Sequence, residues 1–460
     1  MSTASALVLF GSSGDLAHKL VLPALYRLET HRDLDCPVVG VARSDWDTDE
    51  LRRQTGEAVR AAFAEVDEGA LGRFLDRLRY VAGDYDDPAT FDQLKAVLGE
   101  RAGHAVHYLA VPPPLFATVA GALAREGLNT ASTLVVEKPF GTDLASARAL
   151  DAELRRYFPE ERLLRVDHFL GKEAVEDLLV FRFANRLFEP VWNRDHVRSV
   201  QLTFAETLDV ADRGGFYDAV GAIRDVVENH LFQVLAYLTM DPPAGADRDA
   251  EQRERTRLLR SVRTLRRQDV VRGQYAGYGD VDGVRQGSTT ETFAALHLRI
   301  DNWRWHDVPF LVRAGKCLPV GALEAVVELR DAPPLHLIER SRAAGNLVRL
   351  RLQPDAGITV EILAKEPGPR YATRTVPLQV DLSSALGPTQ TAYERVLANA
   401  LAGDRSHFLS MDAVEQSWRI VDPILDLDDA PLPYEPGSWG PAPADTLPGP
   451  AGWHPLSTRP

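Results

Sequence analysis

Two short segments of the chain carry the acid, imidazole and ammonium groups that proton transfer requires. Residues 165–173 read Arg-Val-Asp-His-Phe-Leu-Gly-Lys-Glu and contain Asp167, His168 and Lys172. Well downstream, a helical pattern carries Asp225 and His230. An imidazole titrates near neutrality and a carboxylate can orient it, so these residue types are typical of general acid–base catalysis. Taken singly, His230 also fits a packed helix residue, and Asp167 and Lys172 also fit a structural ion pair.

A glycine loop at the start of the chain predicts a dinucleotide site. Residues 4–10 form an apolar run typical of a buried parallel strand, a helical pattern extends to residue 31, and residues 37–42 give a second strand. Glycines let the backbone approach a diphosphate, and the helix start offers amides and a positive dipole end. The Gly-x-x-Gly spacing alone also fits an ordinary turn. The expected cofactor ligands are Gly11, Ser12, Ser13, Gly14, Asp15 and Leu16.

The second strand favours NADP over NAD. NAD-specific chains usually place an acidic residue there for the ribose hydroxyl, whereas this chain has Arg43 and Ser44. A guanidinium can bind the 2′-phosphate through two hydrogen bonds. Asp45 and Asp47 follow closely and would repel that phosphate if they turned inward, so some use of NAD stays open. Arg43 also fits a solvated surface charge.

The pattern of elements changes near residue 165. Up to there, strands at 105–111 and 133–137 alternate with helical stretches, which predicts a Rossmann-like parallel sheet over residues 1–165. Beyond it, apolar runs arrive without regular helices between them, which predicts a larger α+β domain with a mostly antiparallel sheet over 166–440. Helical stretches are expected at 218–238 and 249–265. Residues 441–460 are rich in Pro and Gly and predict a wrapped tail or a disordered end.

Composition narrows the class of protein. The chain has 460 residues, 45% of them hydrophobic, and a formal charge of −14, which argues against a nucleic-acid or anionic membrane surface. Two cysteines without metal-ligand spacing argue against a disulfide framework and predict no structural zinc or other metal site. No leader or membrane-spanning run is evident. We expect a cytoplasmic enzyme.

Six motifs give the chain a resemblance to the glucose-6-phosphate dehydrogenase family, which extends from about residue 5 to 425. They are Gly-Ser-Ser-Gly-Asp-Leu-Ala at 11–17, Glu-Lys-Pro-Phe-Gly at 137–141, Val-Asp-His-Phe-Leu-Gly-Lys-Glu at 166–173, Arg-Phe-Ala-Asn-Arg at 182–186, Ile-Arg-Asp with Asn-His at 223–230, and Val-Pro-Phe with Gly-Lys at 308–316. The resemblance implies a Rossmann domain joined to an α+β domain, and dimers or tetramers formed through its broad sheet.

The resemblance also implies a reaction and roles for named residues. His230 would remove the C1 hydroxyl proton of glucose 6-phosphate with Asp167 as its partner, while hydride passes to NADP, giving 6-phosphogluconolactone in the pentose phosphate pathway. Lys138 would lie between cofactor and sugar, and Pro112 would help to fix the loop beside the cofactor. The remaining substrate ligands would be His168, Lys172, Glu206, Asp225, Lys316 and Gln353.

Three departures from the family pattern cluster on phosphate recognition. Leu20 stands where most members have a basic residue, Phe169 replaces the usual tyrosine, and Gly321 lies where another cation is usual. Because a hydrogen bond to a charged group contributes roughly 1.5–3 kcal/mol, these losses favour a second hypothesis, a paralogue that oxidises an unphosphorylated or differently substituted hexose. Phe116, also in place of tyrosine, is expected to matter little, and Arg351 alone hints at a second, structural NADP site.

Two further alternatives stand beside these. A noncatalytic sensor would keep the fold without turnover, but the intact pair Asp167 and His230 speaks against it. The Gfo/Idh/MocA oxidoreductases also join a Rossmann unit to an open sheet and carry a Glu-Lys-Pro element. Their usual glycine loop and their lysine and histidine spacing fit this chain less well.

Overall fold

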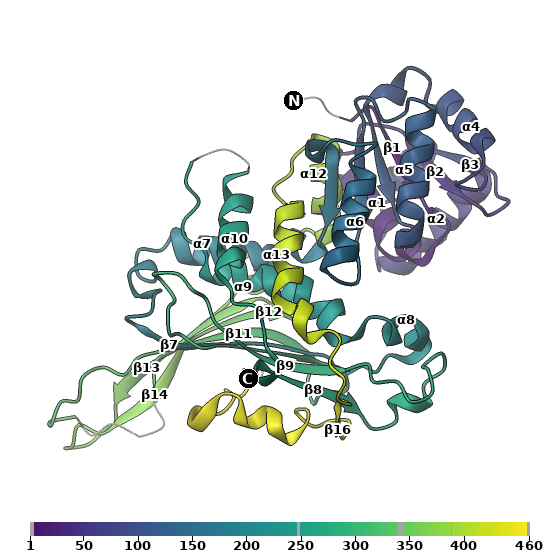
Figure 1. The fold of residues 1–460 in the computed structure, drawn as a ribbon. Coiled ribbons are helices and arrows are strands. Elements are labelled where there is room, and N and C mark those ends of the chain that lie inside the picture. The colour runs from purple at the N-terminus through teal and green to yellow at the C-terminus, as the bar shows by residue number, and fades with distance from the viewer. Residues whose placement is uncertain (1–3, 246–248, 339–344, 388, 458–460) are drawn as a thin grey trace. The chain divides into compact units, whose positions relative to one another are not determined.

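The fold is taken from a computed structural model that describes residues 4–245, 249–338, 345–387 and 389–457. The chain forms two compact units (Figure 1). The first comprises Met1–Glu173, Pro243–Arg253 and Gln390–Glu415, and the second comprises Ala174–Pro242, Glu254–Thr389 and Gln416–Pro460. The first break, at residue 173, lies near the boundary expected at 165. Two later segments return to the first unit, which local sequence patterns do not reveal.

The first unit is built on a seven-stranded sheet with the order β15-β6-β5-β4-β1-β2-β3. All neighbours are parallel except β15 and β6. The order of β1 to β6 is the 3-2-1-4-5-6 arrangement of dinucleotide-binding sheets. The strands are β1 Ala6–Phe10, β2 Val38–Ala42, β3 Leu78–Ala82, β4 Ala105–Leu109, β5 Thr133–Glu137, β6 Leu163–Val166 and β15 Phe408–Leu409; the helices are α1 Leu22–His31, α2 Thr48–Ala62, α3 Glu68–Arg77, α4 Pro88–Leu98, α5 Phe116–Arg125, α6 Leu144–Leu154 and α12 Ala392–Ala402.

Because side chains alternate along a strand, β1 contributes to the hydrophobic packing on both faces of the sheet. Leu7 and Leu9 point to one face and pack with α1, α2, α3 and the returning helix α12. Phe10 points to the other face, where its ring stacks on Phe91 of α4 at 6.1 Å. All five residues of β1 are fully buried, as expected for a central parallel strand.

The second unit is built on a nine-stranded sheet with the order β14-β13-β12-β11-β7-β10-β9-β8-β16. It is antiparallel except for the pairs β7–β10 and β8–β16, which are parallel. A mostly antiparallel sheet is what the sequence predicts. The strands are β7 Val197–Ala205, β8 Val270–Tyr275, β9 Phe293–Leu298, β10 Phe310–Gly315, β11 Ala322–Leu329, β12 Leu347–Gln353, β13 Gly357–Lys365, β14 Thr373–Asp381 and β16 Leu432–Tyr434. The helices are α8 Gly214–Asp218, α9 Phe232–Thr239 and α11 Leu382–Leu386, while α7 Glu173–Phe183, α10 Ala250–Ser261 and α13 Met411–Val421 begin in the first unit and end in the second.

The C-terminal segment after β16 covers one face of this sheet (Figure 1). The guanidinium of Arg313 lies between the rings of Trp439 and Trp453, 4.3 and 4.4 Å from their centroids. Arg349 donates to the carbonyl of Pro455 at 2.8 Å. The described residues 441–457 thus pack against the sheet, where the indole of Trp453 covers the guanidinium of Arg313. Among the described residues, none of the helices has the length and the apolar composition of a membrane-spanning segment.

Candidate active site

The expected cofactor residues of the first unit gather at the carboxyl edge of its sheet. Gly11 follows β1, Arg43 follows β2, Pro112 comes after β4 and Lys138 follows β5 directly. In sheets of this order, ligands bind at that edge, where the strand order reverses between β1 and β4. The position of the candidate cofactor site therefore follows from the strand order as well as from the glycine loop.

Gly11 adopts a backbone conformation that other residues rarely adopt. The tight turn that results leaves room for a ligand beside the glycine loop. The φ of Gly11 is +80°, and a Cβ there would lie 2.2 Å from the carbonyl oxygen of Ala110. Ser12 is fully buried against Gly40, and the hydroxyl of Ser44 donates to that of Ser13 at 2.9 Å. Asp15 and Leu16 lead into a π-helical turn at Ala17–Val21. This cradle, closed to a side chain and lined by hydroxyls, fits a diphosphate.

Arg43, the residue expected to contact the adenosine ribose phosphate, has a largely exposed guanidinium just after β2. Its guanidinium lies 5.8 Å from the ring centroid of Tyr85 and 3.9 Å from Asp84, and its side chain is 58% exposed. Asp47 does not turn toward it, because its carboxylate accepts a hydrogen bond from the amide of Glu50 and caps α2. The arrangement fits NADP, since an exposed guanidinium can exchange a long ion pair for a phosphate.

The loop after β6 fixes the acid and imidazole of the first cluster. Asp167 is fully buried and accepts a hydrogen bond from the amide of Phe169 at 2.9 Å, which caps a short 3₁₀ turn. The Nζ of Lys172 lies 3.5 Å from the ring centroid of Phe169. Burial lowers the pKa of Lys172 to about 8, with the Asp167 carboxylate acting in the opposite direction. Phe169 thus lacks a hydroxyl but positions a cation by a cation–π contact.

Three residues that the sequence did not single out for this role support that loop. The hydroxyl of Tyr108 donates to Glu137 at 2.5 Å, and Tyr393 also donates to this carboxyl group. The ring of Tyr393 stacks on His168 at 6.0 Å with an interplanar angle of 17°. Glu137 belongs to the Glu-Lys-Pro motif and was within reach of sequence reasoning. Tyr393 lies on α12, more than two hundred residues downstream, and no local signal marks it.

The pH dependence of stability should reveal the raised pKa of Glu137. Burial raises its pKa from the ordinary value of 4.5 to about 7. Between these values the folded state binds a proton that the unfolded state has released, so stability falls as pH rises, by up to about 3 kcal/mol. The Glu137→Gln variant should not show this decrease in stability as the pH rises. Urea unfolding of both proteins at pH 5 and pH 8 measures it, and an equal pH dependence in the two proteins would contradict the assignment.

His230 lies in the second unit on a π-helical segment at Ile223–Leu231, which continues into α9. The sequence predicted one helix at 218–238, but Gly221 interrupts it with φ of +72°. A Cβ at Gly221 would lie 2.6 Å from the carboxylate of Glu291, which accepts a hydrogen bond from the amide of Ile223 at 3.0 Å. The buried acid therefore sets where the histidine-bearing helix begins. His230 itself is 3% exposed.

The expected sugar ligands of the second unit meet at one end of its sheet. Because β7 and β10 are parallel and in register, Glu206 and Lys316 follow them side by side and form an ion pair of 2.6 Å. Lys316 also lies 5.6 Å from the ring centroid of Tyr217. Burial, together with the charges of Asp225, Glu291 and Glu206, raises the pKa of Tyr217 well above its usual value. Tyr217 is a residue that sequence reasoning missed, since nothing in its surroundings marks it.

The other expected residues take the following positions. Gln353 ends β12 at the same end of the sheet, with β11 between it and β7. Gly321 is exposed, with only Thr207 near the position of a Cβ, and Leu20 is 43% exposed. The guanidinium of Arg351 is engaged by the carbonyl of Asp355 at 2.7 Å.

Comparisons with known proteins decide the family. Residues 8–177 match the model of the glucose-6-phosphate dehydrogenase NAD binding domain, and residues 179–454 match that of the C-terminal domain. Glucose-6-phosphate 1-dehydrogenase 1 of Mycobacterium bovis is 43% identical over 442 residues, covering 96% of this chain and 94% of the relative. The chain belongs to the glucose-6-phosphate dehydrogenase family. It is thus an NADP-dependent oxidoreductase acting on a CH–OH group.

Solved structures agree with this membership. The crystal structure of glucose-6-phosphate 1-dehydrogenase from Mycobacterium avium has a TM-score of 0.90 at 41% identity and covers 99% of this chain and 100% of that one. A glucose-6-phosphate dehydrogenase in complex with its substrate glucose-6-phosphate has a TM-score of 0.92 at 32% identity, with 99% of each chain covered. The predicted fold class is confirmed, and the Gfo/Idh/MocA alternative is superseded by the glucose-6-phosphate dehydrogenase assignment.

Proposed function

We propose that the protein oxidises glucose 6-phosphate at C1 to 6-phosphogluconolactone. The observation that carries this proposal is the match to both glucose-6-phosphate dehydrogenase domains over residues 8–177 and 179–454. NADP, when bound, supplies the hydride acceptor. The cradle at Gly11 and the exposed guanidinium of Arg43 support its binding to this chain. We place the reaction in the cytoplasm and in the pentose phosphate pathway.

In this proposal the chain's own residues move the proton and hold the sugar. His230 removes the C1 hydroxyl proton, and Asp167 orients the imidazole and stabilises its cationic form. Lys138 lies between cofactor and sugar, and Glu206, Asp225 and Gln353 bind sugar hydroxyls. His168, Lys172 and Lys316 bind the phosphate. The π-stacking of His168 and the cation–π contact of Lys172 support their roles, because each fixes a cationic or hydrogen-bonding group before the substrate arrives.

Steady-state kinetics with glucose 6-phosphate and glucose tests the substrate. Charge-assisted hydrogen bonds from three groups should raise kcat/KM for the phosphate ester by at least about 10³, since each contributes roughly 1.5–3 kcal/mol. Lys172→Ala should reduce this ratio by lowering only the value for glucose 6-phosphate. A ratio near one would refute the proposed substrate. Absence of NADPH formation with either sugar would refute the activity altogether.

The alternative of a paralogue acting on another hexose receives no support from these relatives. The Mycobacterium bovis and Mycobacterium avium proteins both bear the name glucose-6-phosphate 1-dehydrogenase. The substitution to Phe169 also leaves a cation, Lys172, held over its ring. Loss of a hydroxyl at this position therefore does not leave the loop without a charged group for phosphate.

We also propose that the protein forms a homodimer or homotetramer through the edge of its larger sheet. Strands β13 and β14 place six partly or fully exposed apolar residues on one face, in three paired rows: Ile358 with Val380, Val360 with Leu378, and Ile362 with Val376. Leu378 is 56% exposed and Val380 is 49% exposed. A contiguous apolar face on an edge hairpin is typical of a subunit interface.

A charge on this face should separate the subunits. The double variant Leu378→Asp, Val380→Asp places two carboxylates where apolar contact is expected, so the molar mass should fall to that of a monomer, 50.8 kDa. Size-exclusion chromatography with light scattering measures it. Val97→Asp, an exposed apolar site on α4 of the first unit, is the control and should keep the wild-type mass. An unchanged mass in the double variant would exclude this edge as the interface.

A further inference from the structure

The second unit carries a pocket of about 700 Å³ that none of the proposed active-site residues lines. It lies between the segment after α7, the end of α9, helix α10 and the loop before β10. Its volume falls within the range of small-molecule sites. Its lining combines four arginines with three acidic residues, two asparagines and one tryptophan.

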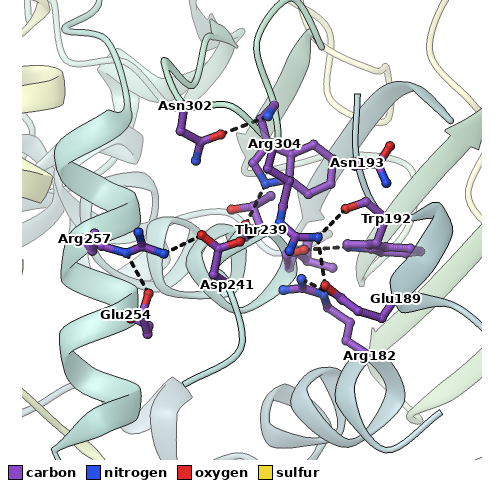
Figure 2. A network of polar contacts seen from close by, with 12 residues as sticks. Arg182, Glu189, Trp192, Asn193, Thr239, Asp241, Glu254, Arg257, Asn302 and Arg304 are labelled. Carbon is purple, nitrogen blue, oxygen red and sulfur yellow. Dashed lines mark hydrogen bonds and ion pairs between the residues drawn. The ribbon is translucent and has the colours of Figure 1, made fainter. Parts of the chain in front are cut away.

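The floor of the pocket is an ion-pair network in which every guanidinium has a carboxylate partner. Glu189 accepts from Arg304 at 2.8 Å and from Arg182 at 3.3 Å. Asp241 pairs with Arg304 at 2.7 Å and with Arg257 (Figure 2). Each guanidinium is held by at least one carboxylate, so the floor needs no ligand for its own stability and its shape is pre-formed.

Side chains beside this ion-pair network bind the C-terminal end of α9, and these bonds anchor the floor of the pocket to the protein core. The buried Arg182 donates to the carbonyl of Tyr237 at 2.9 Å, and the indole of Trp192 donates to that of Leu238 at 2.7 Å. The indole of Trp305 donates to the carbonyl of Thr239 at 2.6 Å. Three carbonyls that a helix leaves without intrahelical partners are thereby satisfied.

At the rim of the pocket, unlike at the floor, the charged groups and the aromatic ring are available to bind a ligand. Trp303 is 84% exposed, and the guanidinium of Arg194 lies 4.3 Å from its ring centroid. Arg186 is exposed and makes no ion pair within the described residues. Against these two guanidinium groups stands one carboxylate, Asp195, 3.8 Å from Arg194. An exposed indole beside uncompensated positive charge is unusual on a chain of net charge −14.

We propose that this pocket binds a purine nucleoside phosphate. The base would stack on the open face of the Trp303 indole, opposite Arg194, and the phosphates would pair with Arg186 and Arg194. Indoles stack nucleobases, and guanidinium groups bind phosphate through paired hydrogen bonds. A sugar phosphate or inorganic phosphate would leave the indole unused, and a polyanionic nucleic acid is disfavoured by the acidic surface as a whole. The ring and the two cations together therefore select a nucleotide.

Isothermal titration of the full chain with ATP, in a Gly11→Ala background that weakens the cofactor site, tests this proposal. We expect one molecule of ATP to bind per chain. Trp303→Ala and Arg186→Glu should each weaken binding at least tenfold, whereas Trp303→Phe, which keeps an aromatic face, should stay within about threefold of wild type. Arg101→Glu, at an exposed position of the first unit, is the charge control and should bind as wild type does.

Separate titrations with adenosine and with tripolyphosphate assign the two halves of the ligand. ATP should bind more tightly than either, because each lacks one group of contacts. Equal binding of tripolyphosphate and ATP would overturn the stacking role of Trp303. Absence of binding at millimolar ATP, or binding that both Trp303→Ala and Arg186→Glu leave unchanged, would overturn the site. Thermal melting of each variant shows whether it is folded, and a folded Trp303→Phe keeps the test decisive.

Discussion

His230→Asn should lower kcat for glucose 6-phosphate by about 10³, because a positioned general base contributes roughly 10²–10⁴ to such a step. Asparagine keeps much of the volume of the buried side chain, which is 3% exposed, so the fold should persist. It cannot accept and hold the hydroxyl proton. The affinity for NADP and KM for the sugar should change little, since the proposed role is exerted only in the transition state.

Three comparisons make this result specific. Asp167→Asn should give a smaller loss of kcat, because it removes the partner of the imidazole but leaves the base. His196→Asn, at an exposed position of the second unit, is the matched control and should behave as wild type. Added imidazole should partly restore a His230→Ala variant. If His230→Asn kept more than a tenth of the wild-type kcat, the histidine would not be the base.

Gly11→Ala should weaken NADP binding at least 100-fold. With φ at +80°, an alanine is strained, and its Cβ would lie 2.2 Å from the oxygen and 2.9 Å from the carbon of the Ala110 carbonyl. Both atoms are backbone, so the ends of β1 and β4 must separate at the expected diphosphate position. A 100-fold loss corresponds to about 3 kcal/mol, which is in the range of such backbone strain and displacement.

The neighbouring glycine provides the control for this prediction. A Cβ at Gly14 would come no closer than 3.2 Å, to the carbonyl oxygen of Gly11, and its φ is not in the left-handed region. Gly14→Ala should therefore weaken NADP binding by less than tenfold. Isothermal titration gives both affinities, and thermal melting gives the accompanying loss of stability. Wild-type affinity in Gly11→Ala would mean that the cofactor does not approach this turn.

Local patterns in the sequence determined the elements with strong periodicity. The apolar runs at 4–10, 37–42, 105–111 and 133–137 all form strands of the parallel sheet, and the glycine loop follows the first of them. The short strands β3 and β6 went unpredicted, because β3 exposes Arg79 and β6 interrupts its apolar run with Arg165. The guanidinium of Arg165 is buried only because Asp151 and Glu160 pair with it.

By itself, then, the sequence determined the strand–loop–helix cofactor motif, the change to an antiparallel sheet and the residue types for proton transfer. Only the tertiary structure decided that α12 returns to the first unit, where Tyr393 stacks on His168 and binds Glu137. It also decided that Glu206 and Lys316 meet, and that Trp453 covers Arg313. Periodicity reports which face of an element is buried, whereas these contacts depend on which distant segment covers it, and no local interaction encodes that choice.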